Sequence, residues 1–97
     1  ILIIGIAFKG NPETTDLRNS PSLEIYNKLK KKNKLELYDV NSFNIKKQNR
    51  ELKIVRNLKL NEYDLILIIN NHLEYKKLIY KNLRYLLYNR YFYYLLN

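Results

Sequence analysis

The chain has 97 residues, which is enough for one domain with a single modest hydrophobic core. Hydrophobic residues make up 46% of it, which argues against disorder, and no apolar run approaches the ~20 residues that a membrane-spanning helix needs. The absence of cysteine excludes disulfides, thiolate metal sites and a cysteine nucleophile within this chain, and the single histidine, His72, argues against a histidine metal cluster.

The charge balance is strongly basic, with a formal net charge of +9 and a pI near 9.7. Such a balance favours polyanionic partners such as nucleic acid, an anionic membrane or phosphorylated ligands. Codon bias is the simpler explanation, because lysine, isoleucine, asparagine and tyrosine are all abundant and lysines outnumber arginines 13 to 5. We therefore rank a small basic nucleic-acid-binding domain last among the candidate functions, and we expect no membrane partner.

The chain contains no methionine, and its first residue already lies in an apolar, β-branched run. We therefore expect residues 1–97 to form one domain that is a fragment of a larger protein. Any catalytic group of that protein would then lie in sequence outside this chain.

The first 40 or so residues predict a βαβ unit, and with it a parallel sheet. Residues 1–4 are typical of a buried strand, and the polar stretch after them predicts a long loop. Ser20 followed by Pro21 predicts a helix start, with a side-chain cap and a proline in the first turn. The helix is predicted over residues 21–33, with a left-handed asparagine at its end, and a second strand over residues 35–39.

The second half of the chain continues the alternation of strand and helix. Residues 40–62 are the least legible part, with residues 53–55 as a candidate short strand. Residues 64–69 predict a strand that is buried on both faces, a helix is predicted from Glu74, and residues 91–96 predict a last strand. The pattern as a whole predicts an α/β fold: a three-layer Rossmann-like domain with a mostly parallel sheet.

The loop after the first strand has the composition of a binding site. It leaves the carboxyl end of a predicted parallel strand, which is where open α/β sheets bind their ligands. Gly5 and Gly10 have the glycine spacing of a P-loop, but Asn11 and Pro12 stand where a P-loop needs lysine and a hydroxyl residue. A G-x-G-x-x-G dinucleotide fingerprint is also missing. The sequence therefore supports neither a nucleoside triphosphatase nor a complete NAD site.

Three motifs follow one another in this half of the chain. They are Gly-Ile-Ala-Phe-Lys over residues 5–9, Asp-Leu-Arg-Asn-Ser-Pro over residues 16–21, and a Tyr-Asp pair at residues 38–39. Their order and spacing resemble the G-x-A-F-K, D-x-R-x-S-P and Y-D segments in the C-terminal domain of UDP-glucose/GDP-mannose dehydrogenases. Residues 69–76 are similar to the strand end of that family, which leads into an aromatic-lysine pair. The resemblance covers residues 1–80.

The resemblance implies a UDP-binding domain in which Phe8 and Lys9 contact the nucleotide-sugar. A lysine at the carboxyl end of a strand can neutralise a pyrophosphate as a mobile charge. Arg18 has two interpretations: it binds a phosphate as part of the substrate site, or it pairs with Asp16 or Glu13 and fixes the shape of the loop. We favour the structural interpretation and keep Arg18 as a candidate substrate-binding residue.

Three other polar residues have simple structural interpretations. Ser20 is predicted to cap a helix, whose amino terminus can also favour an anion. Asp39 ends a strand where dinucleotide-binding folds carry an acid that binds ribose, but without the glycine fingerprint a turn or packing role is favoured. His72, which has no second histidine to act with, is predicted to be an ordinary loop residue.

The resemblance also implies a parent activity: an NAD-dependent UDP-sugar 6-dehydrogenase that oxidises the sugar C6 alcohol to a uronic acid for polysaccharide biosynthesis in the cytoplasm. NAD and the catalytic thiol would belong to an N-terminal domain outside this chain, so we assign no catalytic residue here and expect the chain alone to be inactive. The implied partners are a UDP-sugar, that NAD-binding domain and a second copy in a homodimer. The alternative is a non-catalytic remnant that serves as a packing or dimerisation module. The sugar and the nucleotide base are left open.

Overall fold

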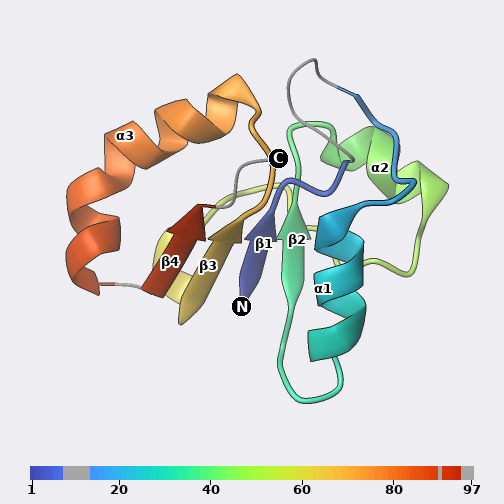
Figure 1. Ribbon diagram of the computed structural model, residues 1–97, viewed down its shortest axis with the longest axis horizontal. Coiled ribbons are helices and arrows are strands. Elements are labelled where there is room, and N and C mark those ends of the chain that lie inside the picture. The colour runs from blue at the N-terminus through green and yellow to red at the C-terminus, as the bar shows by residue number, and fades with distance from the viewer. Residues whose placement is uncertain (8–13, 90, 95–97) are drawn as a thin grey trace.

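The computed structural model of this chain describes residues 1–7, 14–89 and 91–94, with side chains described as far as residue 82 and at Arg84. Within those ranges, four strands, three α-helices and one 3-10 turn follow one another (Figure 1). In order they are β1 (Leu2–Ile4), α1 (Pro21–Leu29), β2 (Glu36–Tyr38), α2 (Ser42–Gln48), η1 (Leu60–Glu62), β3 (Leu65–Ile68), α3 (Leu73–Asn89) and β4 (Tyr91–Tyr94).

These four strands form one parallel sheet in the order β2-β1-β3-β4. In the central strand β1, Ile3 is level with Leu37 of β2 and with Leu67 of β3. The candidate strand at residues 53–55 is reduced to a single parallel bridge between Ile54 and Leu37, at the outer edge of β2. The mostly parallel sheet expected from the sequence is confirmed.

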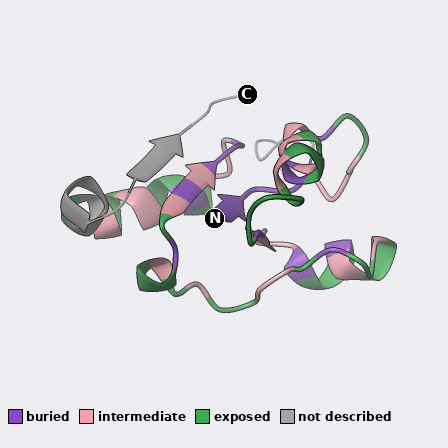
Figure 2. Ribbon diagram, turned by 90° about the horizontal axis from the view of Figure 1, so that it is seen from below, coloured by how far each residue is buried: buried purple, intermediate pink, exposed green. Residues whose placement is uncertain are grey.

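Helices cover both faces of this sheet. The chain moves outward from β1 to β2 through α1, and in the opposite direction from β3 to β4 through α3 (Figure 1). Right-handed crossovers therefore place α1 and α3 on opposite faces. Figure 2, in which β1 is purple throughout, shows the buried strand between these layers. The predicted three-layer, Rossmann-like α/β fold is confirmed.

The side chains of β1 alternate between the two layers. Ile3 packs with Tyr26 of α1, whereas Leu2 and Ile4 pack with Tyr75 of α3. All three β1 residues are 0% exposed, so both faces of this central strand are covered. A strand that is buried on both faces reads as a continuous apolar run, which explains the sequence of residues 1–4.

Helix α1 begins where the sequence predicts and ends four residues earlier than expected. Ser20 is its N-cap and accepts the N–H of Leu23 at 3.2 Å, and Pro21 is its first residue. The helix ends at Leu29, whose carbonyl oxygen accepts both the backbone N–H and the side-chain amide of Asn33. Asn33 thus closes the helix by hydrogen bonding and not in the left-handed conformation that we expected.

Helix α2 is an element that the sequence did not predict. Asn41 at its N-cap makes no capping bond through its side chain, so the usual local signal is missing. Ile45 is fully buried in the cluster on the α1 face, and the ammonium of Lys46 donates to the carbonyl oxygens of Arg50 and Leu52. The burial of Ile45 and the attachment of Lys46 to the segment after the helix therefore stabilise α2.

The remaining expectations are largely met. In β3, Ile66 and Ile68 are buried while Leu65 and Leu67 are partly exposed, so burial on both faces is only partly correct. The predicted last helix and strand are present as α3 and β4, and residues 95 and 96 of that strand lie outside the described residues. In the part of the chain that the structure describes, no helix is long and apolar enough to cross a membrane.

Substitution of the two β1 isoleucines tests the three-layer architecture. We expect Ile3→Ala and Ile4→Ala each to lower the free energy of unfolding by roughly 2–5 kcal/mol, because each leaves a cavity in a different layer. Leu65→Ala, at a partly exposed position of β3, is the matched control and should cost less. Urea denaturation followed by circular dichroism measures all three. A near-neutral effect of either isoleucine would show that its face of β1 is open.

Candidate functional site

The order of the strands places a candidate site at the carboxyl ends of β1 and β3. These two strands are neighbours, and their crossovers leave in opposite directions, so the sheet has its topological switch point between them. The loop after β1 and the segment from Ile69 to His72 meet there, at the upper edge of the sheet in Figure 1. Open α/β sheets bind ligands in the crevice at such a point.

Gly5 lies at this point in a conformation that favours glycine. Its φ is +96°, and its N–H donates to the carbonyl oxygen of Tyr38 at 2.7 Å. A Cβ atom here would lie 2.8 Å from Cγ of Asn70, the buried residue after β3. The loop after β1 can therefore pass close to the end of β3 only because residue 5 has no side chain.

The next two peptide groups are held from both sides. Oδ2 of Asp39 accepts the N–H of Ile6 at 2.8 Å and the N–H of Ala7 at 3.1 Å. On the carbonyl side, the hydroxyl of Ser22 donates to Gly5 and the hydroxyl of Ser20 donates to Ile6. The peptide groups 5–6 and 6–7 are thus clamped between one carboxylate and two hydroxyls, which fixes the path of the chain out of β1.

Asp39 is itself almost completely buried, with 2% of its surface exposed. Its second carboxylate oxygen, Oδ1, accepts the N–H of Asn41 at 2.9 Å, and its own N–H donates to the hydroxyl of Ser42 at 3.0 Å. Both carboxylate oxygens are therefore engaged by backbone N–H groups. The predicted turn and packing role of Asp39 is confirmed.

The outer part of the loop has a local structure of its own. The guanidinium of Arg18 donates to both carboxylate oxygens of Asp16, with Nη2 2.8 Å from Oδ2 and Nε 3.0 Å from Oδ1. The hydroxyl of Thr14 accepts the N–H of Asp16, and the side chain of Gln48 in α2 donates to the carbonyl oxygen of Thr15. The predicted pairing of Arg18 with Asp16 is confirmed, and α2 supports the loop from the side.

This ion pair changes the acid-base properties of both groups. Hydrogen bonds from Arg18 stabilise the ionised carboxylate and lower the pKa of Asp16 to about 2, while Asp16 raises the pKa of Arg18. The Arg18 side chain is 87% exposed, so water and salt screen the pair, and its contribution to stability is small.

The structure describes some of the other residues to which the sequence analysis gave a role, but not all of them. Phe8 and Lys9, the predicted nucleotide-sugar contacts, lie outside the described residues, as does Glu13. Ser20 is confirmed as the cap of α1. His72 has a more definite role than we expected, since its Nδ1 accepts the N–H of Glu74 at 3.0 Å and caps the start of α3.

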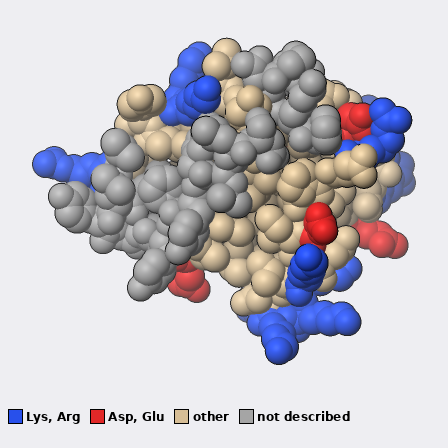
Figure 3. Space-filling view, in the orientation of Figure 1, with Lys and Arg blue, Asp and Glu red and all other residues tan. Residues whose placement is uncertain are grey.

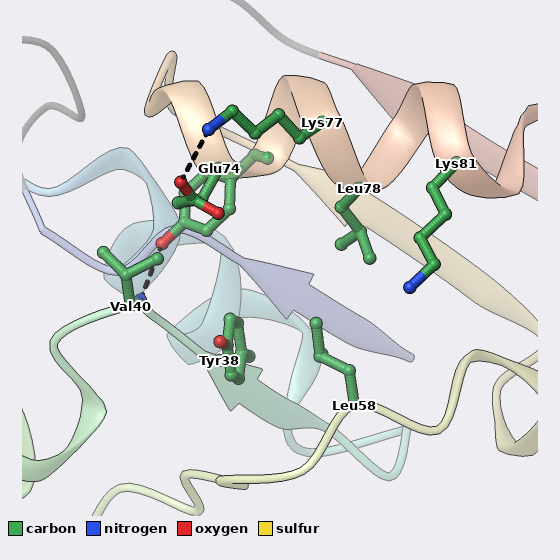
Figure 4. A pocket seen from close by; sticks show the side chains of 8 residues that line it. Tyr38, Val40, Leu58, Glu74, Lys77, Leu78 and Lys81 are labelled. Carbon is green, nitrogen blue, oxygen red and sulfur yellow. Dashed lines mark hydrogen bonds and ion pairs between the residues drawn. The ribbon is translucent and has the colours of Figure 1, made fainter.

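A hollow with a volume of about 270 Å³ opens between α3 and the end of β2, away from the clamped loop (Figure 4). Apolar side chains line most of it, while Lys77 and Lys81 lie along its α3 side. The hydroxyl of Tyr75 accepts the N–H of Val40 at 3.1 Å, and burial, together with the charge of Asp39, raises the pKa of this tyrosine well above its usual range. Sequence reasoning missed this contact because its partners are 35 residues apart.

Among the described residues on the face in Figure 3, lysines and arginines lie in separate groups and do not form one continuous patch. In the described part of the chain, no group of three or more histidines, aspartates or glutamates could hold a metal ion. The described part of the site is a backbone frame around Asp39, with the ion pair of Asp16 and Arg18 at its border.

The role of Asp39 can be tested by Asp39→Asn, which keeps the shape of the side chain but turns one acceptor into a donor. With an NH₂ group facing a backbone N–H, we expect a loss of roughly 1.5–3 kcal/mol in the free energy of unfolding. Asp64→Asn, at an exposed position, is the control and should be close to neutral. Equal effects of the two substitutions in urea denaturation would contradict the clamp.

The ion pair of the loop can be tested by titration. Because Arg18 favours the charged carboxylate, Asp16 should stay ionised as the pH falls and take up its proton only near pH 2. Arg18→Gln should return the pKa of Asp16 towards the ordinary value of 3.8. NMR of the side-chain carboxyl carbons measures both values. An Asp16 pKa that is unchanged by the substitution would show that the pair does not persist in solution.

Comparison with known proteins gives one match. Residues 2–95 match the domain described as the UDP-glucose/GDP-mannose dehydrogenase family, UDP binding domain. Neither the curated proteins nor the solved structures that were searched give a significant match. The matched region includes every strand and helix described above, and the chain therefore belongs to the UDP-glucose/GDP-mannose dehydrogenase family, as its UDP binding domain.

Proposed function

We propose that this chain binds the UDP-sugar substrate of an NAD-dependent UDP-sugar 6-dehydrogenase, the enzyme that oxidises a sugar C6 alcohol to a uronic acid for polysaccharide biosynthesis. Membership of the UDP binding domain family supports the ligand class. The observation that carries the proposal is the clamped loop after β1, which leaves the sheet at its switch point. A cytoplasmic location and a homodimer are parts of the same proposal.

In this proposal the ligand contacts come from residues beyond the clamp. Fixing the peptide groups 5–6 and 6–7 gives the chain a defined direction just before Phe8 and Lys9. Phe8 would contact the nucleotide-sugar, and the ammonium of Lys9 would neutralise the diphosphate as a point charge. The domain would thus contribute orientation and charge neutralisation to the parent reaction, with the reacting groups elsewhere.

Arg18 can pair with Asp16 and bind a phosphate of the ligand at the same time. Its Nε and Nη2 are engaged by Asp16, but no hydrogen bond from its Nη1 is formed within the described residues. With the side chain 87% exposed, Nη1 can meet a phosphate oxygen while the pair with Asp16 holds the guanidinium in place. We therefore retain Arg18 as a substrate-binding residue that is oriented by Asp16.

The described residues do not fit NAD itself. The chain has two glycines, whereas the dinucleotide fingerprint needs three. The carboxylate of Asp39 is buried and accepts three backbone N–H groups, so it is not presented to a ribose. NAD, which accepts hydride in the parent reaction, would be held by an N-terminal domain outside this chain. No step of the oxidation is assigned to residues of this chain.

Ligand binding is tested by titrating the chain with UDP, UDP-glucose and GDP, using calorimetry and thermal unfolding. A uridine ligand at 100 times its Kd should stabilise the fold by about 2.7 kcal/mol. Lys9→Gln and Arg18→Gln should each weaken binding roughly 10- to 100-fold, the range expected for loss of a charged hydrogen bond.

Lys34→Gln is the matched control, because Lys34 is an exposed lysine that precedes β2 at the opposite edge of the sheet. It should leave the affinity for UDP unchanged. If none of the nucleotides stabilises the folded chain at millimolar concentration, the binding proposal fails, and the remnant packing or dimerisation module is the better description.

A further inference from the structure

Four cations surround an exposed aromatic ring at α2. Phe43 is 55% exposed, with the Nζ atom of Lys47 4.4 Å from its ring centre and Cζ of Arg56 5.4 Å from it. Lys46 and Arg50 complete the lining of a shallow hollow of about 220 Å³. We call these five residues the α2 surface. They come from the helix and from the segment that bridges to β2, so the fold brings them together.

Within the part of the chain that the structure describes, no acid neutralises the cations of the α2 surface. Lys46 is engaged by the carbonyl oxygens of Arg50 and Leu52, which gives it a structural role. Within the described residues, no ion pair joins Lys47, Arg50 or Arg56 to a carboxylate, although other lysines have such pairs. Three unneutralised positive charges close together favour an anion that carries several charges.

The exposed ring of Phe43 indicates which class of anion would bind here. Single-stranded nucleic acid combines repeated phosphates with flat bases that stack on aromatic side chains, and both features are matched here. A membrane-binding surface would need a broad apolar face. Among the residues whose burial is described, the other large exposed hydrophobic residues are Leu73 and Tyr80, which lie on α3. We propose that the α2 surface binds single-stranded nucleic acid: a base takes the place of the Lys47 and Arg56 side chains over the Phe43 ring, and these two cations, with Arg50, then pair with phosphates.

This inference does not depend on the proposed UDP function. The α2 surface belongs to the β2 side of the sheet, whereas the switch point lies between β1 and β3 (Figure 1). It also differs from the general basic character of the chain. The lysine run at residues 30–32 carries three charges, one fewer than the α2 surface, but the Tyr26 ring beneath Lys30 is buried and only 8% exposed, so no base can stack there.

The experiment uses a fluorescent oligothymidylate of about 12 nucleotides, within the site size of small single-strand-binding folds, and follows anisotropy as the salt concentration is raised. Phe43→Ala should weaken binding roughly 5- to 150-fold, the range for loss of one stacked base, and Phe43→Tyr should retain binding. Lys47→Gln, Arg50→Gln and Arg56→Gln should each reduce the slope of log affinity against log salt by about 0.7, since each removes one phosphate contact.

The triple substitution of residues 30–32 to glutamine is the control, matched in charge to the combined substitution of Lys47, Arg50 and Arg56 to glutamine, and it should leave the stacking contribution intact. If the control weakens binding as much as the α2 substitutions do, and Phe43→Ala has no effect, binding is by diffuse charge and the proposal is wrong. Binding to vesicles containing phosphatidylserine without binding to the oligonucleotide would also overturn it. Circular dichroism verifies that each variant is folded, and UDP titration of the same variants should be unaffected.

Discussion

The buried carboxylate of Asp39 is the constraint on which the ligand edge of this domain depends. A charge removed from water must be paired or hydrogen-bonded, or it costs several kcal/mol. Here three backbone N–H groups meet that requirement, two from the loop after β1 and one from the turn after β2. One side chain therefore joins the ends of two neighbouring strands, and the serines at the start of α1 complete the clamp from the carbonyl side.

This use of Asp39 separates the domain from dinucleotide-binding folds of similar topology. In those folds a glycine-rich turn brings the cofactor to the helix, and an acid at the end of the second strand binds the ribose. In this chain the acid has the same place but faces the backbone of the first loop. The architecture thus has the same sheet edge for a ligand, at the carboxyl ends of β1 and β3, but its Asp39 carboxylate is not exposed to a ribose. This agrees with a domain family that is described by UDP binding.

The contrast between local and distant contacts explains how much the sequence could predict. The cap of α1 and the pair between Asp16 and Arg18 join residues two or three positions apart, and both were predictable. The two partners of Asp39 in the loop after β1 lie 32 and 33 residues away, and nothing in the sequence next to Asp39 identifies them. Helix α2 was missed for a related reason, because it lacks a side-chain cap and relies on the burial of Ile45. The pattern of apolar residues identifies buried strands, but it does not predict which strand ends lie next to each other in the fold.

The net charge of +9 does not by itself predict which anions bind where. The local pairing of each cation has to be known as well. At the loop after β1, Arg18 is paired with Asp16 and the charge of Asp39 is met by backbone N–H groups, so among the described residues the geometry of the loop should contribute more than net potential to ligand selection, beside the charge proposed for Lys9. At the α2 surface the cations have no acidic partners among the described residues, and attraction of a polyanion should dominate. Since each neutralised phosphate adds to the salt dependence, binding that depends on few charges and binding that depends on many should respond differently to ionic strength. The pairing of cations, and not their number, therefore separates a selective nucleotide site from a polyanion-binding surface.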